Sequence, residues 1–465
     1  MIALALSILL QEKTIALVAG PLDSHPIDTH EYEKNVHLLK HLLERSLQNV
    51  KVDVHLGGWP ADPAALDRAD TIVITSGGSD RKLEDHPLYV GDRLGQLERH
   101  MKRGCGVMFF HWSTFHPAAH HDKITEWCGG YFDYETGPAP RKWRSAISTA
   151  DWTTSLPTPD HPVVRGVRPF KVKEEFYFKI RFRDEDPRLK LLLACKDGDP
   201  RENAVMWAVE RADGGRGLGF TGGHFTANWW NPDFRRLVLN AIAWSAKIEV
   251  PAGGVDSELP PRKRVLVVTG HHHPAHDWRA TSLALIHVLE RDPRLKVDVV
   301  ENPEKIGPCD VLLLNYNNWK TPGLSDEAKA KWLAHDGALA VIHFANGAFL
   351  DWPAYREKFT RRAWVEPGSG HDPFGAFRVE LKPHEITAGL APFETQDELY
   401  FKQAGDVPLE PLAFARSTVT KQDEPMAWTF EFGKHRAFQT VLGHADVSIQ
   451  KAAALIRRGV AWSAG

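Results

Sequence analysis

Cysteine is scarce in this 465-residue sequence, and the usual signatures of thiol chemistry are missing. No CxxC pair and no spacing typical of a disulfide framework or a thiolate zinc site occurs. The HExxH pattern of zinc hydrolases is absent too. We therefore expect the four cysteines to be small buried side chains. They are Cys105, Cys128, Cys195 and Cys309.

The sequence also has little excess charge and no long apolar run. Its formal net charge is −3, with acidic and basic residues interspersed, so we predict no nucleic-acid partner. The apolar run at the N-terminus, MIALALSILL, is too short to span a bilayer, and we predict no membrane span. This run lacks a basic n-region and a small-residue cleavage site. Residues 1–12 are therefore either a degenerate export signal of a periplasmic protein or an apolar extension of a cytoplasmic one.

What the sequence does contain is an internal duplication. The strand-like runs TIALVAG and RVLVVTG are each followed by a segment with helical spacing, HEYEKNVHLLKHLLERS and HDWRATSLALIHVLERD. Further pairs follow in the same order, including CGVMFFHW with ALAVIHFA, and AIAWSAK with GVAWSAG. Shared order over so long a stretch indicates two copies of one domain.

The composition and the order of the runs define the fold that we expect. Apolar residues make up 43% and charged residues 25%, as in soluble globular proteins. Buried strands that alternate with helices predict an α/β fold with two tandem flavodoxin-like domains and mainly parallel sheets. We place the first domain at residues 13–250 and the second at 262–465. The Pro- and Gly-rich residues 251–261 are the predicted linker.

Histidines are concentrated at the predicted carboxyl ends of strands, where sheets of this kind bind ligands. His111 matches His343, and His224 matches His444, in the two halves. Imidazole exchanges protons near neutral pH and is the commonest metal ligand, so we take these four as candidate catalytic residues. Further histidines follow the first strand of each half, and from these we select His30 and His271 as candidate substrate-binding residues.

Two carboxylates and several tryptophans complete the candidate site. Glu175 and Glu398, in KEEFYF and QDELYF, are the candidate catalytic carboxylates. They suit either acid–base chemistry or, with the histidines, a transition metal such as zinc, and the sequence leaves the metal open. Tryptophan rings beside the histidines suit the C–H faces of sugars, although core packing is the alternative. These candidates are Trp112, Trp229, Trp230 and Trp352.

The motifs together resemble the trehalose-utilisation, or ThuA-like, domain family. In the second half the resemblance lies in IHFANGAFLDWPAYREKF, HEITAGLAPFETQDELY and PMAWTFEFGKHRAFQTVLGH. In the first half it lies in GGYF, HPVVRGV, EEFY and GGH. The resemblance implies a fold similar to class I glutamine amidotransferases and a role in the metabolism of disaccharides or their keto forms.

Each half departs from the family pattern at a different place. The first half has Asp133 and Tyr134 after GGYF, where the family usually has a histidine. The second half keeps that histidine, His371, a further candidate substrate-binding residue, but has RRAW instead of the glycine pair. Either one domain has lost the activity or the two contribute to a composite cleft.

Three hypotheses about the function follow. The first is a carbohydrate-processing enzyme, an isomerase, lyase or hydrolase, that uses histidine and carboxylate acid–base or metal-assisted chemistry. The second is a non-catalytic carbohydrate-binding or scaffold protein, and the third is an interaction module; homo-oligomer formation is open. Because His111 and His343 follow the central strands where a glutamine amidotransferase has its nucleophilic Cys, we predict no glutaminase activity.

Overall fold

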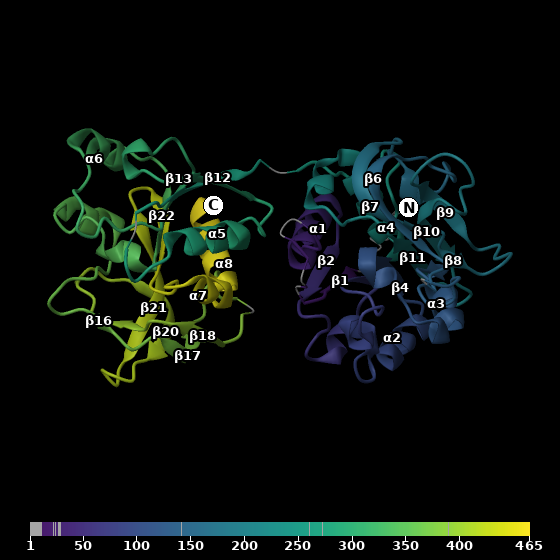
Figure 1. Cartoon of the computed structure of the whole chain (residues 1–465), viewed down its shortest axis with the longest axis horizontal. Coiled ribbons are helices and arrows are strands. Elements are labelled where there is room, and N and C mark those ends of the chain that lie inside the picture. Colours follow the sequence, from purple (N-terminus) through teal and green to yellow (C-terminus); the bar gives the residue numbers. More distant parts are fainter. Residues whose placement is uncertain are drawn as a thin grey trace, which may run out of the picture. The chain divides into compact units, whose positions relative to one another are not determined.

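The computed structural model describes residues 12–465, except residues 22, 24, 27, 28, 141, 260, 272 and 389. The chain divides after Leu259 into two compact units, and each is an α/β domain with a central sheet (Figure 1). The N-terminal run, apart from residue 12, lies outside the described residues, and so does His272.

The first domain has a seven-stranded sheet in the order β2-β1-β3-β4-β11-β10-β9. Pairing is parallel from β2 to β11, and β10 and β9 continue the sheet antiparallel. The strands are β1 (Lys13–Ala19), β2 (Val50–His55), β3 (Thr71–Thr75), β4 (Gly106–Phe110), β9 (Lys190–Ala194), β10 (Ala204–Glu210) and β11 (Arg216–Phe220). The flavodoxin-like parallel core therefore forms as the alternating pattern predicts.

Helices cover both faces of this sheet because its strands are apolar on both sides. On β1, Leu17 faces the core under α1 and α4, while Ala16 and Val18 face the core under α2 and α3. Asn231 begins α4 by accepting hydrogen bonds from the first turn, with Pro232 at the first helical position. The helices are α1 (Tyr32–Ser46), α2 (Arg93–Lys102), α3 (His121–Cys128) and α4 (Pro232–Ser245).

Two small antiparallel pairs extend from the first domain. The longer pair, β6 with β7, contains the KEEFYF segment, whose Glu174 contacts the loop after β11. The shorter pair joins β5 to β8. Their bounds are β5 (Gly130–Tyr131), β6 (Ala146–Thr153), β7 (Lys171–Phe178) and β8 (Arg181–Phe182).

The second domain repeats this plan in a nine-stranded sheet, ordered β13-β12-β14-β15-β22-β21-β20-β17-β18. Its pairing is parallel from β13 to β22 and antiparallel beyond. The hairpin that stands apart in the first domain here joins the main sheet through β17 and β20. The strands are β12 (Lys263–Val268), β13 (Leu295–Val300), β14 (Val311–Leu314), β15 (Ala338–Ile342), β17 (Gly375–Leu381), β18 (Phe393–Asp397), β20 (Glu410–Arg416), β21 (Asp423–Phe432) and β22 (His435–Thr440).

Helices again cover both faces of the second sheet. Figure 1 shows α5, α7 and α8 on one side and α6 on the other, in agreement with the two core clusters. The helices are α5 (Trp278–Leu289), α6 (Asp326–Leu333), α7 (Asp446–Lys451) and α8 (Ala453–Ala464), and a short pair joins β16 (Gly370–His371) to β19 (Tyr400–Phe401).

The segment that the sequence marks as a linker, 251–261, is attached to the first domain over residues 251–259. Val255 is fully buried in the first core, and its N–H donates to Asn240 on α4. Ser257 accepts a hydrogen bond from Arg235, also on α4. The division after Leu259 falls within this segment. Most of the segment packs on the first domain through Val255 and through hydrogen bonds to α4.

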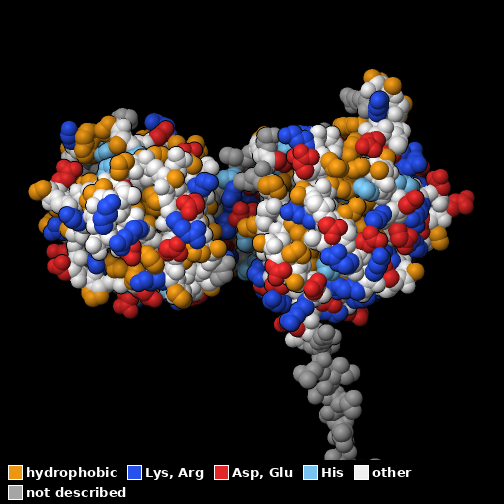
Figure 2. Space-filling view, turned by 90° about the horizontal axis from the view of Figure 1, so that it is seen from below, with side chains coloured by type: hydrophobic (Ala, Val, Ile, Leu, Met, Phe, Trp, Pro, Cys, Tyr) orange, Lys and Arg blue, Asp and Glu red, His pale blue; other side chains and the backbone are white. Residues whose placement is uncertain are grey.

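The surface and the cysteines agree with the composition. Figure 2 shows acidic and basic side chains interspersed over each unit on the face in view. Among the described residues, no helix is both long enough and apolar enough to cross a membrane. All four cysteines are free thiols; three are buried and Cys309 is half-buried.

Candidate functional site

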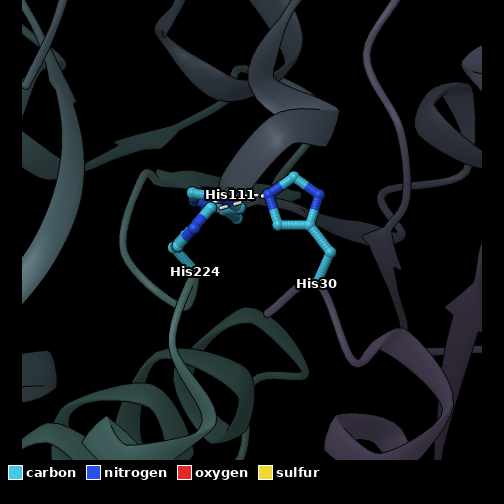
Figure 3. A group of neighbouring side chains, drawn as sticks. All are labelled: His30, His111 and His224. Atoms are coloured by element: carbon cyan, nitrogen blue, oxygen red, sulfur yellow. Dashed lines mark hydrogen bonds between the residues drawn. The ribbon is translucent and has the colours of Figure 1, made fainter. Parts of the chain in front are cut away.

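Three histidines of the first domain converge above the carboxyl ends of the parallel strands (Figure 3). His30 lies in the loop before α1, His111 directly follows β4, and His224 lies in the loop after β11. Nε2 of His30 is 3.1 Å from Nε2 of His111 and 3.0 Å from Nδ1 of His224. Nε2 of His111 is 3.3 Å from Nδ1 of His224. We call these residues the first triad.

The backbone is strained where the sheet presents these rings. His111 has a φ of 55° and its counterpart His343 a φ of 43°, both left-handed and unusual for a residue with a side chain. Such a conformation costs about 1–3 kcal/mol and persists where the surrounding structure enforces it, which favours a functional role. A similar sharp strand-to-helix turn exposes the nucleophile in α/β-hydrolases.

Hydrogen bonds fix the tautomers of two triad members. Nδ1–H of His111 donates to the Thr221 carbonyl over 2.8 Å. Nδ1–H of His30 donates to the Asp23 carboxylate over 2.9 Å. Because each neutral ring carries one proton, both Nε2 atoms are left as acceptors that face the centre of the triad. The hydroxyl of Tyr177 donates to one of them, Nε2 of His111, over 2.9 Å.

Asp23 supports the first triad from behind. Its carboxylate also accepts hydrogen bonds from Tyr32 and from His25, whose ring lies 3.7 Å from the His30 ring between centroids. Burial by itself raises the pKa of Asp23, but the hydrogen bonds from His30, His25 and Tyr32 outweigh it and hold that pKa well below its usual range. The indole of Trp112 lies 5.3 Å from the His30 ring.

A buried carboxylate holds the loop that carries the third histidine. Glu174 accepts hydrogen bonds from the backbone N–H groups of Glu175, Gly223 and His224 and from the side chain of Asn228. Burial raises the pKa of Glu174 to about 7, against the opposing effect of these donors. Gly223 has a φ of 105°, which a side chain rarely adopts, so this glycine permits the turn.

The second domain repeats the arrangement with His276, His343 and His444, which we call the second triad. One ring nitrogen of each lies within 4.8 Å of the others. Nδ1–H of His343 donates to the Val441 carbonyl over 2.6 Å, and its Nε2 accepts from the Tyr400 hydroxyl at 2.9 Å. The loop after β22 is again held by a buried carboxylate.

That carboxylate is Asp397. It accepts hydrogen bonds from the backbone N–H groups of Glu398, Gly443 and His444. Burial raises its pKa to about 7, as for Glu174. Sequence reasoning selected the second acid of each pair, Glu175 and Glu398, and missed the first. The paired acids in KEEFYF and QDELYF, with a tyrosine two residues after the second, were the available signal.

Glu398 connects several groups of the second triad. Its Oε2 is 3.1 Å from Nδ1 of His444 and 3.8 Å from Nε2 of His343, and its Oε1 is 3.6 Å from Nδ1 of His371. Glu175 in the first domain is 3.6 Å from Nδ1 of His224. The carboxylates predicted from sequence thus lie at their triads, and the one in the second domain makes the closer contact.

The two triads differ in access. A cleft of about 820 Å³ lies over the second triad, and its walls include His276, His371, Glu398 and Tyr400. The cavity beside the first triad has about 410 Å³; Asp23, Arg81 and Trp112 line it, but none of the three triad histidines does. The second triad is therefore the one that a substrate in a described cleft can reach.

Burial favours the neutral form of most of the triad histidines. Burial and, to a smaller extent, neighbouring histidines lower the pKa of His224 to about 4 and that of His276 to about 3. The same causes lower the pKa of His111 and of His343 well below the usual range. Neutral imidazoles can accept a proton or bind a metal ion.

Several predicted substrate-binding residues lie away from the triads. Trp229 is only 2% exposed and stacks on Phe110 in the core. Trp352 is 8% exposed and packs in an apolar core cluster, whereas Trp230 is 45% exposed and does not line either cavity. Proximity to a histidine in sequence fails here because neighbours on a short helical turn point in different directions. Trp229 and Trp352 are core residues and lie outside the site.

The histidine-rich loop of the second domain also requires a correction. His271 bonds to the Trp319 carbonyl and is not a member of the triad, which uses His276 instead. His276 precedes the first residue of α5 by two positions, as His30 precedes α1. His371 does line the cleft, with a side chain 39% exposed.

With the duplicated fold and paired triads established, the family follows from the match to known sequences. The ThuA model, described as trehalose utilisation, matches residues 25–245 and again 264–463. The chain belongs to the ThuA family. The model matches twice, once in each half of the chain, as the internal repeat predicts. No curated protein matches the chain significantly.

Solved structures similar to this ThuA-family chain include two bacterial ThuA-like proteins. The one from Parabacteroides merdae is 23% identical, aligns over 44% of this chain and 90% of its own, and has a TM-score of 0.37. The one from Bacteroides uniformis is 17% identical over 43% and 91%, with a TM-score of 0.35. A glutamine amidotransferase from Thermotoga maritima is 9% identical over 46% and 76%, with a TM-score of 0.28.

Proposed function

We propose that this protein is a carbohydrate-processing enzyme and that the cleft of its second domain converts a disaccharide or a keto-sugar. The observation that carries the proposal is a cleft of about 820 Å³ that contains Glu398 and two histidines, His276 and His371. That volume is within the range of about 300–1,000 Å³ typical of small-molecule sites. Membership in the trehalose-utilisation family supports a sugar as the ligand.

The cleft walls have the composition of a sugar site. Trp319, 40% exposed, and Trp364 supply aromatic faces, which suit the C–H faces of a pyranose. Asn317, Asn346 and Asp351 supply hydrogen-bonding groups for hydroxyls. Aromatic walls with a few polar groups are typical of specific pockets. These residues replace Trp229 and Trp352 as the candidate sugar contacts.

The chemistry that fits these residues is proton transfer next to a sugar carbonyl. Glu398 and His444, 3.1 Å apart, form a carboxylate–imidazole pair that can accept a proton from carbon and return it elsewhere. Burial raises the pKa of Tyr400 well above its usual range, so its hydroxyl stays protonated and holds His343 in one orientation. Isomerisation, elimination or bond cleavage would each use this pair.

Metal-assisted chemistry at the same cleft is the second candidate. It is favoured by the three ring nitrogens of the second triad, which lie within 4.8 Å of one another next to Glu398. Dialysis against a chelator separates the two candidates. Acid–base chemistry predicts unchanged turnover, whereas loss of turnover that zinc restores favours the metal-assisted reading.

The test is product analysis by mass spectrometry with the full-length chain and a panel of disaccharides and their keto forms. We expect conversion of one keto form and a loss of about 100-fold or more in kcat with Glu398→Gln. Glu394→Gln, an exposed acid on the adjacent strand β18, is the matched control and should retain turnover. Binding without conversion across the panel would contradict the proposal and favour a non-catalytic carbohydrate-binding protein.

A further inference from the structure

We propose that the first triad, His30, His111 and His224, is a binding site for a transition-metal ion of the zinc type. The inference concerns the first domain, and it is independent of the function proposed for the cleft of the second. It depends on the spacing of three nitrogen atoms, on the tautomers that their hydrogen bonds enforce, and on the carboxylate behind His30.

The spacing matches that of ligands around one ion. A tetrahedral zinc ion with Zn–N bonds of about 2.0–2.1 Å holds its nitrogen ligands about 3.3 Å apart. The three nitrogen pairs of the first triad are separated by 3.0, 3.1 and 3.3 Å. Figure 3 shows the three rings, from loops distant in sequence, directed toward one another. No large movement is needed to bring the rings around an ion.

The tautomers of His30 and His111 leave the lone pairs of their two Nε2 atoms directed toward each other. Nδ1–H of His30 is engaged by Asp23 and Nδ1–H of His111 by Thr221, so neither Nε2 carries a proton. These Nε2 atoms are nevertheless only 3.1 Å apart. A proton on Nδ1 of His224 and the hydroxyl of Tyr177 can each satisfy one of them, but neither places a hydrogen between the two. A metal ion bound between the two Nε2 atoms would accept both lone pairs.

The groups behind the rings are those that metal sites use. Histidine ligands commonly donate their second N–H to a carboxylate or a backbone carbonyl, which orients the ring and increases its basicity. His30 donates to the carboxylate of Asp23, and His111 donates to the backbone carbonyl of Thr221. Upon binding an ion through Nδ1, His224 would keep its proton on Nε2. Glu175, 3.6 Å from Nδ1 of His224, is a carboxylate that could take the next position.

The choice of ion follows from the ligand types. Three neutral imidazoles with a carboxylate nearby suit zinc and its first-row neighbours, whereas magnesium and calcium prefer oxygen. The site would tie together the loop before α1, the end of β4 and the loop after β11. A bound ion would therefore raise the melting temperature of the first domain, since it binds only the folded form.

The test is a zinc titration of the full-length chain after chelator treatment, with a chromophoric competitor. We expect the number of tight zinc sites per chain to fall by one in His224→Ala and to stay unchanged in His120→Ala, a half-buried histidine of the same domain. Asp23→Asn keeps all three ligands, and we expect it to weaken zinc binding about 10- to 100-fold. Circular dichroism establishes that each variant is folded.

Two results would overturn the inference. One is a wild-type chain that binds no zinc under these conditions. The other is unchanged stoichiometry and affinity in both His224→Ala and Asp23→Asn. If His224→Ala does not fold, Asp23→Asn decides, because affinity unchanged in that variant contradicts a site that Asp23 supports. The titration contains no sugar, so its outcome is separate from that of the product analysis.

Discussion

The two domains share a fold and a histidine arrangement. They differ in the groups that support the triad histidines and in whether a cleft gives access to the triad. In the first, a carboxylate lies behind His30, and the three nitrogens are 3.0–3.3 Å apart. In the second, His276 stacks on Phe344, and the cleft of about 820 Å³ reaches the triad. This difference is the reason for proposing an ion site in the first domain and a substrate site in the second.

The largest expected effect concerns the two tryptophans that pack in the cores. Trp229→Ala should lower the free energy of unfolding of the first domain by about 3–5 kcal/mol, and Trp352→Ala should do the same for the second, because each leaves a large cavity. Calorimetry of the full chain should show one transition shifted in each variant, which assigns the transitions to domains. Trp230→Ala, at a 45% exposed position, is the control. Equal shifts from all three would contradict the core assignment.

A smaller effect should distinguish the domains at acid pH. The first domain has a second buried histidine pair, His86 and His116, with ring centroids 4.9 Å apart. Burial lowers the pKa of His86 to about 4 and that of His116 well below the usual range. Between pH 6.5 and 4 the unfolded chain therefore binds protons that the folded one does not, and stability is lost as the pH falls.

For His86 alone this loss amounts to about 3 kcal/mol by pH 4. Calorimetric scans from pH 7 to pH 4 should therefore lower the melting temperature of the first domain more than that of the second. His86→Gln should reduce the difference, since glutamine does not titrate. Parallel decreases in the two transitions would show that this histidine pair does not set the acid sensitivity.

The smallest predicted effect concerns the tyrosines that donate to the triads. Tyr177→Phe and Tyr400→Phe each leave a buried histidine nitrogen without its donor, at a cost of about 1–3 kcal/mol in the zinc-free protein. Zinc should relieve the loss only for Tyr177→Phe, because an ion in the first triad engages the same lone pair of His111. Thermal melts with and without zinc check this. Relief in neither variant, or in both, would weaken the contrast between the domains.

Much of the fold and part of the site could be predicted from the sequence. Buried runs such as TIALVAG and RVLVVTG predict parallel strands, and glycine or histidine after each run marks the strand end. For that reason His111, His343, His224 and His444 could be placed together. His276 could also have been predicted as a triad member, because it lies two residues before α5 just as His30 lies two residues before α1.

The roles of the tryptophans and of the first acid in each acidic pair could not be predicted, because they depend on side-chain direction, which sequence spacing does not give at turns. Trp229 and Trp230 are neighbours, but one is 2% exposed and the other 45%. Similarly, Glu174 and Glu175 are adjacent on β7, and only the first is fully buried, where it holds the loop of His224. Tertiary contacts decide which member of such a pair faces the core.

The most direct test of the account is a comparison of kcat/KM for Glu175→Gln and Glu398→Gln, the matched carboxylates of the two triads, in one assay with the converted sugar. If the open second triad is the reactive site, Glu398→Gln lowers kcat/KM by about 100-fold or more, and Glu175→Gln has a much smaller effect. A larger loss from Glu175→Gln would contradict the account and assign the reaction to the first domain.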